Sequence, residues 1–332
     1  MKSQAPQRKQ QQGLTLIELM VSLAIGMTLT SVMLLLFSDS AQRSRDLSRA
    51  SSQIENGRYA SDLLAEDISL AGFWGTLPVE GAAYSNTEPC DTDPSAAWNT
   101  APLTIPAAVR ALPPDSVHGC LANRKAGTAA LLVRRLSTTE TDTASLAGSN
   151  KKYYLQTSFC QDDPVATPFI LSKTKANFTL QNRACTAKNT ARAYVARIYF
   201  VAACNRCGTD TTPTLKRMDL DGDAWVETAL VDGVDTLLLE LGFDTDSNGS
   251  VDSYLSNVSA AGATANWGNV MSVKLHFVTR SIEQARNLDI ALTAQTFRLG
   301  GTVLNTAADG YLRRAYSQTV RLVNPSAARE KQ

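Results

Sequence analysis

An uncharged apolar run near the amino terminus constrains this chain more than any other feature. The twenty residues from Leu19 to Ser38 contain no charge and no proline. A helix rises about 1.5 Å per residue, so this run spans ~30 Å, the thickness of a bilayer core. The residues before it include Lys2, Arg8 and Lys9 and no acid. Positive-inside bias therefore predicts one membrane span, with the leader in the cytoplasm and the rest outside.

A secretory signal peptide is the competing interpretation of this run. It would end in a cleavage site of small residues. The segment Ser38–Ala41 has Asp39 within it and is a poor version of that site, and the helical pattern continues through it. The run is therefore predicted to stay in the protein as an anchor.

One carboxylate, Glu18, lies at the start of the run. A carboxylate in a membrane span is costly and usually marks a partner or a function. No lysine, arginine or histidine lies within a helical turn or two of Glu18, and the next basic residue is Arg43. Its partner must therefore be another chain or a terminal amine. The alternative is that Glu18 reaches the cytoplasmic interface of the membrane, where water would solvate it.

The residues around Glu18 resemble a known processing signal. A basic leader ends in Gly13 and is followed by Leu14-Thr15-Leu16-Ile17-Glu18 and the apolar run. This segment is similar to the prepilin peptidase site of type IV pilins and type II secretion pseudopilins. The resemblance implies cleavage between Gly13 and Leu14, N-methylation of Leu14, and pairing of Glu18 with the amino terminus of a neighbouring subunit. Leu14 departs from the commoner phenylalanine, which we expect to affect only processing efficiency.

The helix is predicted to continue well beyond the membrane. Small and apolar residues recur at spacings of three and four, which is typical of a one-sided helical stripe; they are Leu47, Ala50, Ile54, Gly57, Ser61, Leu64, Ile68 and Ala71. Gly72 and Pro78 mark the expected end. The sequence thus predicts one helix of more than fifty residues, half in the membrane and half packed on a globular head.

Two further segments resemble PilW-type minor pilins. The string Glu55–Gly75, "ENGRYASDLLAEDISLAGFWG", is similar to the segment that follows the membrane in these proteins. The segment Arg313–Asn324, "RRAYSQTVRLVN", is similar to the last strand of PilW-type and J-type pseudopilin heads. For any single residue of the first string, ordinary packing and a helix end are the better explanation, and only the whole string is specific; the second string is also an ordinary alternating strand. Leu77 to Asn150 carries no such resemblance.

Composition and charge limit the classes of partner. The 332 residues are 44% hydrophobic and 19% charged, which suits a globular chain. The formal net charge is +1, and without the first thirteen residues 29 basic residues face 31 acidic ones. No basic stripe with interleaved aromatic residues is present, so no nucleic acid partner is predicted.

The head is predicted to be rich in β-strands. Between Leu77 and Asn150 prolines are frequent, and we expect an elaborated loop or insertion with one strand, Ala129–Arg134. Beyond it, alternating or β-branched segments predict strands at Lys152–Gln156, Pro168–Leu171, Ala193–Ala203, Thr214–Asp219, Trp225–Val231, Val234–Phe243, Val270–Val278 and Arg313–Leu322. The predicted fold class is α+β, a type IV pilin-like fold with one long helix packed across an antiparallel sheet.

Six cysteines predict three disulfides, because an even number in a membrane-targeted chain fits an oxidising compartment. They are Cys90, Cys120, Cys160, Cys185, Cys204 and Cys207. Neighbour pairing closes the shortest loops and is preferred among the fifteen possible connectivities. The last pair, in "CNRC", is expected to be a structural disulfide, with a redox pair or half a zinc site as alternatives.

An aspartate-rich segment, "DTDSNGSVD" from Asp244 to Asp252, is the strongest candidate for a metal site. Its oxygen-bearing residues alternate and Gly249 stands at the sharp turn, as in an EF-hand loop; the candidate ligands are Asp244, Asp246, Asn248, Ser250 and Asp252. Position twelve of that pattern is Leu255, not a bidentate glutamate, so calcium would bind weakly. The alternative is a hairpin turn, which uses the same residue types. No required cofactor is predicted.

Other motifs carry little chemistry. "DLDGD", Asp219 to Asp223, is typical of a hairpin turn. His276 alternates with Lys274 on one strand face and is expected on the solvent side, far in sequence from His118. The sequence has no nucleophile–histidine–acid pattern and no phosphate-binding glycine loop, so the chain is predicted not to be an enzyme.

The resemblance to PilW-type proteins implies a minor pilin that primes type IV pilus assembly and is incorporated at or near the tip. The predicted divisions are a leader (1–13), a membrane and polymerisation half of the helix (14–38), an amphipathic half (39–75) and a periplasmic head (76–332). Expected partners are other minor pilins, the major pilin, prepilin peptidase, the inner-membrane assembly platform and a tip adhesin. A J-type pseudopilin of type II secretion and a membrane-anchored adhesin that never polymerises are the alternatives.

Overall fold

A single helix, α1 (Leu16–Ser69), occupies 54 consecutive residues. The computed structural model describes residues 13–330 except 14, 115, 257–265 and 286–292. The described chain divides into two units, residues 1–50 and 51–332, and each is treated by itself. The predicted helix of more than fifty residues is confirmed, and its end at Ser69 lies shortly before Gly72.

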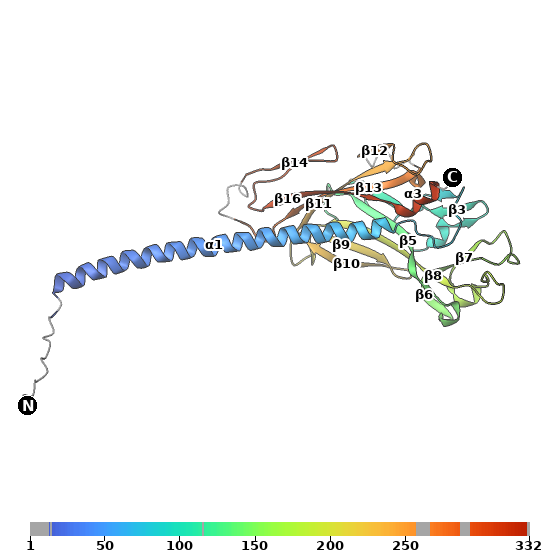
Figure 1. Ribbon diagram of the computed structural model, residues 1–332, viewed down its shortest axis with the longest axis horizontal. Coiled ribbons are helices and arrows are strands. Elements are labelled where there is room, and N and C mark those ends of the chain that lie inside the picture. The colour runs from blue at the N-terminus through green and yellow to red at the C-terminus, as the bar shows by residue number, and fades with distance from the viewer. Residues whose placement is uncertain (1–12, 14, 115, 257–265, 286–292, 331–332) are drawn as a thin grey trace, which may run out of the picture. The chain divides into compact units, whose positions relative to one another are not determined.

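The second unit contains two large antiparallel sheets and several small elements (Figure 1). The seven-stranded sheet consists of β4 (Val109–Leu112), β5 (Ala130–Thr141), β6 (Ser149–Thr157), β7 (Phe169–Thr174), β8 (Ala191–Ala202), β9 (Thr214–Leu220) and β10 (Trp225–Asp232). Its main path runs β10-β9-β8-β5-β4, and β6 pairs with β7 and β8. The four-stranded sheet has the order β12-β11-β13-β16 and consists of β11 (Val234–Phe243), β12 (Ser253–Leu255), β13 (Val270–Arg280) and β16 (Arg313–Arg321).

The second unit also contains several small elements. A three-stranded sheet contains β1 (Ala83–Ser85), β2 (Asn99–Thr100) and β3 (Leu103–Pro106), with β1 and β3 parallel. A hairpin consists of β14 (Thr296–Leu299) and β15 (Thr302–Asn305). Helix α3 (Val323–Arg329) follows β16, and short 3-10 helices lie at Pro94–Ala97, Thr143–Ser145, Lys175–Asn177 and Trp267–Asn269.

Each of the strands predicted by name is present, but two expectations about the sheet are wrong. The head has two large sheets and not one. The segment between Leu77 and Asn150 is also more than a loop or insertion, because it supplies β4 and the twelve-residue β5 to the seven-stranded sheet. The strand predicted there at Ala129–Arg134 is the first half of β5, whereas the four-residue β4 was not predicted.

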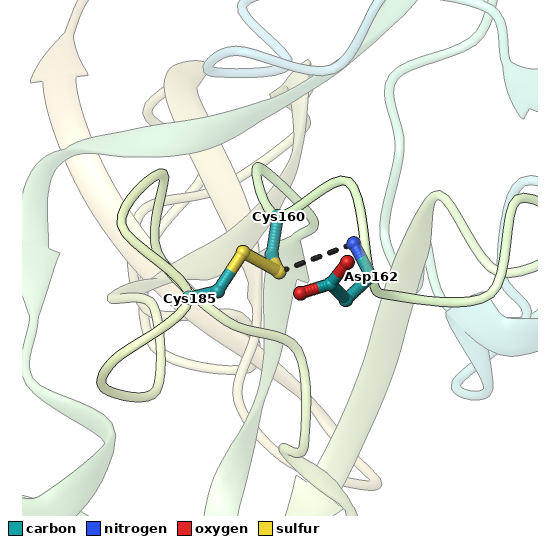
Figure 2. Close-up of side chains that lie close together, drawn as sticks. All are labelled: Cys160, Asp162 and Cys185. Carbon is teal, nitrogen blue, oxygen red and sulfur yellow. Dashed lines mark hydrogen bonds between the residues drawn. A yellow bond between two sulfur atoms is a disulfide. The ribbon is translucent and has the colours of Figure 1, made fainter.

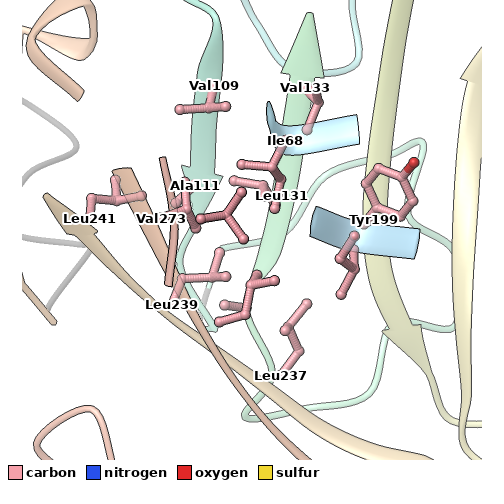
Figure 3. Close-up of a cluster of buried hydrophobic side chains, with 14 of the residues drawn as sticks. Ile68, Val109, Ala111, Leu131, Val133, Tyr199, Leu237, Leu239, Leu241 and Val273 are labelled. Carbon is pink, nitrogen blue, oxygen red and sulfur yellow. The ribbon is translucent and has the colours of Figure 1, made fainter. Parts of the chain in front are cut away.

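The core lies on both faces of the seven-stranded sheet. Along β5, Leu131 and Val133 belong to one hydrophobic cluster, which includes residues of α1 and the four-stranded sheet. Ala130 and Leu132 belong to a second cluster on the other face. Figure 3 shows the first cluster, with Ile68 of α1 beside the side chains of both sheets. Because successive strand residues point to opposite faces, a strand covered on both sides is a continuous apolar run.

The buried stripe of α1 differs from the predicted one in its first turns. The buried residues between 51 and 71 are Gln53, Gly57, Ala60, Leu64, Asp67, Ile68 and Ala71. Ile54 was expected in the stripe but is 43% exposed. Polar Gln53 takes the inward position because its amide donates to the carbonyl oxygens of Thr279 and Leu312, each at 2.9 Å.

Two glycines permit other elements to approach closely: Gly57 lies within α1, and Gly72 lies just after its end. A Cβ at Gly57 would lie 2.3 Å from the ring of Tyr316 on β16, so no larger residue fits there. Gly72 has φ +71 and a Cβ there would lie 2.9 Å from that of Ala108. Glycine is therefore required at the helix end for both conformation and space. Asn324 completes this end by donating to the carbonyl oxygens of Leu70 and Ala71 at 3.3 and 3.2 Å.

Asp67 joins α1 to the seven-stranded sheet through charge. Its carboxylate is 4% exposed. One oxygen accepts from Arg135 at 2.9 Å and Arg197 at 3.0 Å, and the other accepts from the Tyr199 hydroxyl at 2.9 Å. Burial and the neighbouring carboxylate raise the pKa of Tyr199, so the hydroxyl stays a proton donor. Arg197 also contacts Asp219 at 2.9 Å, which extends the network to β9.

We predict that Asp67→Ala lowers the free energy of unfolding by about 3–5 kcal/mol, because it removes the buried anion that pairs with the partly buried Arg135 and Arg197. Glu66→Ala is the matched control, since Glu66 is the exposed preceding acid and should change stability by less than ~0.5 kcal/mol. Denaturant unfolding of the full-length protein in detergent measures both. Equal effects of the two substitutions would contradict a special role for the buried carboxylate.

Candidate functional site

The first turn of α1 contains the predicted assembly residue. Glu18 is exposed, and its carboxylate accepts from the Thr15 hydroxyl at 3.3 Å and the Thr15 amide at 3.5 Å. The Glu18 amide donates in return to the Thr15 hydroxyl at 3.4 Å. This reciprocal pair is a capping box, which satisfies amide donors at a helix start. Sequence analysis missed it, although Thr-x-x-Glu before an apolar run is its signature.

The capping box does not neutralise the charge of Glu18. Within the described residues, no lysine, arginine or histidine forms an ion pair with it. By contrast, Asp39 on the same helix contacts Arg43 at 2.9 Å. Gly13 is exposed, whereas Leu14 and the leader before Gly13 lie outside the described residues. The expectations of cleavage and methylation at Leu14 therefore stay predictions.

The apolar residues that follow Glu18 have no protein around them. Met33, Leu35 and Phe37 are 72%, 71% and 75% exposed. Within the described residues, α1 is the one helix that is long and apolar enough to cross a membrane. So much exposed apolar surface must be covered by lipid or by other helices.

All six cysteines form disulfides in the neighbour pairs that close the shortest loops. Cys90 pairs with Cys120, Cys160 with Cys185, and Cys204 with Cys207. No cysteine is free. The pair in "CNRC" is thus a disulfide, and its sulfur atoms do not bind zinc in this state.

Asp162 lies beside the second disulfide, as Figure 2 shows. Its backbone amide donates to Cys160 Sγ at 3.3 Å. The grouping of Cys160, Asp162 and Cys185 resembles a metal site in composition, but both sulfur atoms are committed to the disulfide. Metal binding requires thiolates, so this cluster has a structural role.

The aspartate-rich loop is held by its own carboxylates. Asp244 is fully buried and accepts from the amides of Ser247 at 2.7 Å and Gly249 at 2.9 Å. Asp252 accepts from the Thr245 amide at 2.7 Å, and Asp246 accepts from the Asn248 side chain at 2.9 Å. The Asn248 amide also donates to Asp246 at 3.2 Å, which is the i to i+2 bond of an Asx turn. Ser250 contributes by donating its amide to Asn248 Oδ1 at 2.7 Å.

A cation from the same chain already contacts this loop. Arg329 of α3 lies 3.0 Å from the Asp244 carboxylate. It also donates to the Gly268 carbonyl oxygen at 3.1 Å and to Asn269 Oδ1 at 2.6 Å. Burial alone would raise the pKa of Asp244, but the Gly249 amide and Arg329 outweigh it and lower that pKa. Sequence analysis missed Arg329 because it is 85 residues from Asp244.

The remaining candidate motifs, one turn and two histidines, lie in turns or are held by packing and hydrogen bonds. "DLDGD" contains the β9–β10 turn, with Gly222 at φ +77. His118 bonds with Ser116 at 3.1 Å. The expectation that His276 faces solvent is wrong, since it is 8% exposed. The β14–β15 turn covers it, and a Cβ at Gly300 would lie 2.9 Å from the His276 ring.

His276 is hydrogen-bonded on both sides across neighbouring strands. Its Nδ1 lies 2.8 Å from the Ser317 hydroxyl, and its Nε2 lies 3.0 Å from the Glu240 carboxylate. Serine, histidine and glutamate therefore lie together, which sequence analysis did not anticipate.

Comparison with known proteins finds two family matches. A family described as type IV pilus-assembly protein W matches residues 198–324. The prokaryotic N-terminal methylation motif matches residues 8–34. The two matches leave residues 35–197 uncovered. No curated protein and no solved structure gives a significant match.

The chain has a long apolar amino-terminal helix with a methylation motif, and antiparallel sheets follow it. These features define the class of type IV pilin-like proteins. Within that class, the two family matches support a PilW-type minor pilin that prepilin peptidase processes. This structural family is consistent with a protein that is not an enzyme. It also implies contacts with other pilins and anchoring by a single span.

We predict that Arg329→Met destabilises the full-length protein by about 3 kcal/mol at neutral pH, because Asp244 is left buried and unpaired. The pKa of Asp244 lies below its ordinary value of 3.8. Its stabilisation is therefore present above that value and is lost as the pH falls through the lowered pKa. The difference between wild type and variant should shrink in acid.

Arg321→Met is the matched control for this prediction. Arg321 pairs with Glu330, but the two side chains are 55% and 47% exposed. Such a surface pair contributes less than ~1 kcal/mol. Thermal and denaturant unfolding between pH 3 and pH 7 compare the two variants. A loss from Arg329→Met that does not depend on pH would contradict a charge-based role.

Proposed function

We propose that this chain is a minor pilin that primes type IV pilus assembly and stays at or near the fibre tip. The observation that carries the proposal is Glu18, a capped but uncompensated carboxylate at the start of an exposed apolar helix. In the membrane, such a charge favours any neighbour that supplies a cation. The methylated amino terminus of an adjacent subunit is that cation in our proposal.

Each predicted division of the chain has a role in the proposed order of processing and assembly. Prepilin peptidase removes residues 1–13 at the inner membrane, while the head from residue 76 onward lies in the periplasm. Residues 14–38 then leave the bilayer and pack among the helices of the fibre, and residues 39–75 carry the head. Other minor pilins, the major pilin and the assembly platform are the proposed partners, and the exposed head contacts a tip adhesin.

Two alternatives predict different outcomes. A J-type pseudopilin would support type II secretion and not a pilus, so the secretion of a reporter enzyme by a deletion strain distinguishes it. A membrane-anchored adhesin that never polymerises would not need Glu18. Both alternatives share the helix, which is why they must be separated by function.

The capping box makes a sharp test of Glu18 possible. Glutamine caps a helix as glutamate does, so Glu18→Gln removes the charge and keeps the cap. We predict that it lowers the number of pili by at least tenfold, since pairing of the charge is lost. Asp39→Asn is the matched control, because Asp39 already pairs with Arg43, and it should leave pilus number unchanged. Sheared pili are quantified by immunoblot.

Processing is checked in the same strains. Amino-terminal sequencing of the mature protein should give Leu-Thr-Leu-Ile-Glu with a methylated first residue, and the Gln variant should start at the same place. Pili at normal number in the Glu18→Gln strain would contradict polymerisation through this charge. A mature protein that begins after Ser38 would contradict the anchor itself.

We propose separately that the aspartate-rich loop binds calcium weakly. Carboxylate oxygens of Asp244, Asp246 and Asp252 lie within 4.8 Å of one another, which supports the proposal. Arg329 competes with the ion for Asp244, so we expect low affinity. A few millimolar calcium should raise the Tm of the full-length protein by a few degrees, since it binds only the folded state, and magnesium should not.

Asp246→Asn should remove this calcium shift, because Asp246 is exposed and forms no ion pair among the described residues. Asp221→Asn is the control, since Asp221 pairs with Lys151 in a different turn. The absence of a shift in the wild-type protein would leave the loop as an Asx-rich turn closed by Arg329.

A further inference from the structure

The Cys204–Cys207 disulfide differs from the other two in its surroundings. It lies in the connection between β8 and β9, and only two residues separate its cysteines. Cys204 is buried at 8% exposure, whereas Cys207 is exposed. A short loop with one buried and one accessible sulfur is the arrangement that thiol–disulfide exchange requires, because an incoming thiolate must reach one sulfur directly.

A buried ammonium lies beside the accessible sulfur. Lys216 Nζ is 4.0 Å from Cys207 Sγ, and the side chain is only 2% exposed. The ammonium also pairs with the Glu227 carboxylate of β10 at 2.6 Å. A cation next to a cysteine favours its thiolate and lowers the pKa of the thiol. Lys216 therefore stabilises the reduced state of Cys207 more than the disulfide.

Hydrogen bonds to Asp210 also hold the loop around this disulfide. Asp210 accepts from the amides of Asn205 at 2.8 Å, Arg206 at 2.6 Å and Thr212 at 3.0 Å. These bonds connect the two sides of the loop without the sulfur atoms. Opening the disulfide also releases little chain entropy, because the loop that it closes is short. The fold therefore tolerates the reduced state.

The other two disulfides close longer loops. Cys160–Cys185 and Cys90–Cys120 close loops of 25 and 30 residues by sequence separation, so each restricts the unfolded chain more. The neighbour of Cys160 is the acid Asp162 (Figure 2). A carboxylate disfavours a nearby thiolate, and its effect on reduction is opposite to that of Lys216.

We propose that Cys204–Cys207 is a redox-active disulfide that a dithiol reductant opens while the other two disulfides stay closed. A thiolate of the reductant attacks Cys207 Sγ and forms a mixed disulfide, and the bonding pair leaves on Cys204 Sγ, which takes up a proton. The second thiol of the reductant, once deprotonated, attacks its own sulfur in the mixed disulfide. This step releases Cys207 as a thiolate beside Lys216 and converts the reductant to its disulfide.

This chemistry connects the redox state to an edge of the sheet. In the oxidised protein Glu227 is the anion that pairs with Lys216. In the reduced protein the Cys207 thiolate competes with that carboxylate for the same ammonium. Glu227 belongs to β10, the outermost strand on one side of the seven-stranded sheet among the described strands. Reduction should therefore loosen the contact between β9 and β10.

The test equilibrates full-length protein in detergent with mixtures of reduced and oxidised dithiothreitol. Thiols are trapped with N-ethylmaleimide, and mass spectrometry of the peptides gives the fraction of each disulfide that is open. We expect Cys204–Cys207 to open at a ratio of reduced to oxidised reagent at least tenfold lower than the other two pairs. Opening of all three together, or of this pair last, would overturn the proposal.

Variants separate the ammonium from the disulfide geometry. Lys216→Met keeps the apolar stem and removes the charge, so the midpoint ratio for opening should rise about tenfold. Lys151→Met is the control, because Lys151 pairs with Asp221 at the opposite end of the β9–β10 hairpin, and it should leave the midpoint unchanged. Resistance to trypsin shows whether each variant is folded.

A second variant keeps the test decisive where Lys216→Met does not fold. Glu227→Gln removes the competing carboxylate and leaves the ammonium, so it should shift the midpoint in the opposite direction. In the reduced wild-type protein, the pH dependence of alkylation at Cys207 should report a pKa below the ordinary ~8.5 of a free cysteine. An unchanged midpoint in the folded variants and an ordinary pKa would make this disulfide a structural one.

Discussion

The buried carboxylate of Asp67 fixes α1 to the seven-stranded sheet of the head. It accepts from two arginines and a tyrosine of the seven-stranded sheet, and its helix also packs on the four-stranded sheet through Gly57 and Tyr316. A buried charge is costly unless it is fully paired. The position of the helix is therefore specified by charge geometry as well as by apolar packing, and a sliding helix would leave these groups unpaired.

The same helix has opposite requirements along its length. Its first half exposes apolar side chains and a carboxylate without a cation among the described residues, which is unfavourable for an isolated chain in water. Its last turns are buried, and residues from the carboxyl end of the chain complete them through Asn324. One half thus depends on other molecules, whereas the other is satisfied within the chain.

Long-range pairs decide the chemistry of the head. Arg329 contacts Asp244, Lys216 lies beside Cys207, and the β14–β15 turn covers His276. In each case a motif that is visible in the sequence has its character set by a residue outside the motif. The aspartate-rich loop has a cation of its own chain, and the "CNRC" disulfide has an ammonium that favours its reduced form.

Local periodicity and contiguous motifs were sufficient to predict the long helix, the named strands, the β-rich head and the family resemblance. The sequence also indicated the neighbour disulfides, since short loops are the easiest to close. No local pattern reveals that two sheets are present, that β4 and β5 belong to one of them, or that His276 is buried, because these features depend on contacts between distant segments. Asp67 and Arg329 likewise acquire their partners only on folding, since pairing over 68 to 130 residues leaves no local pattern.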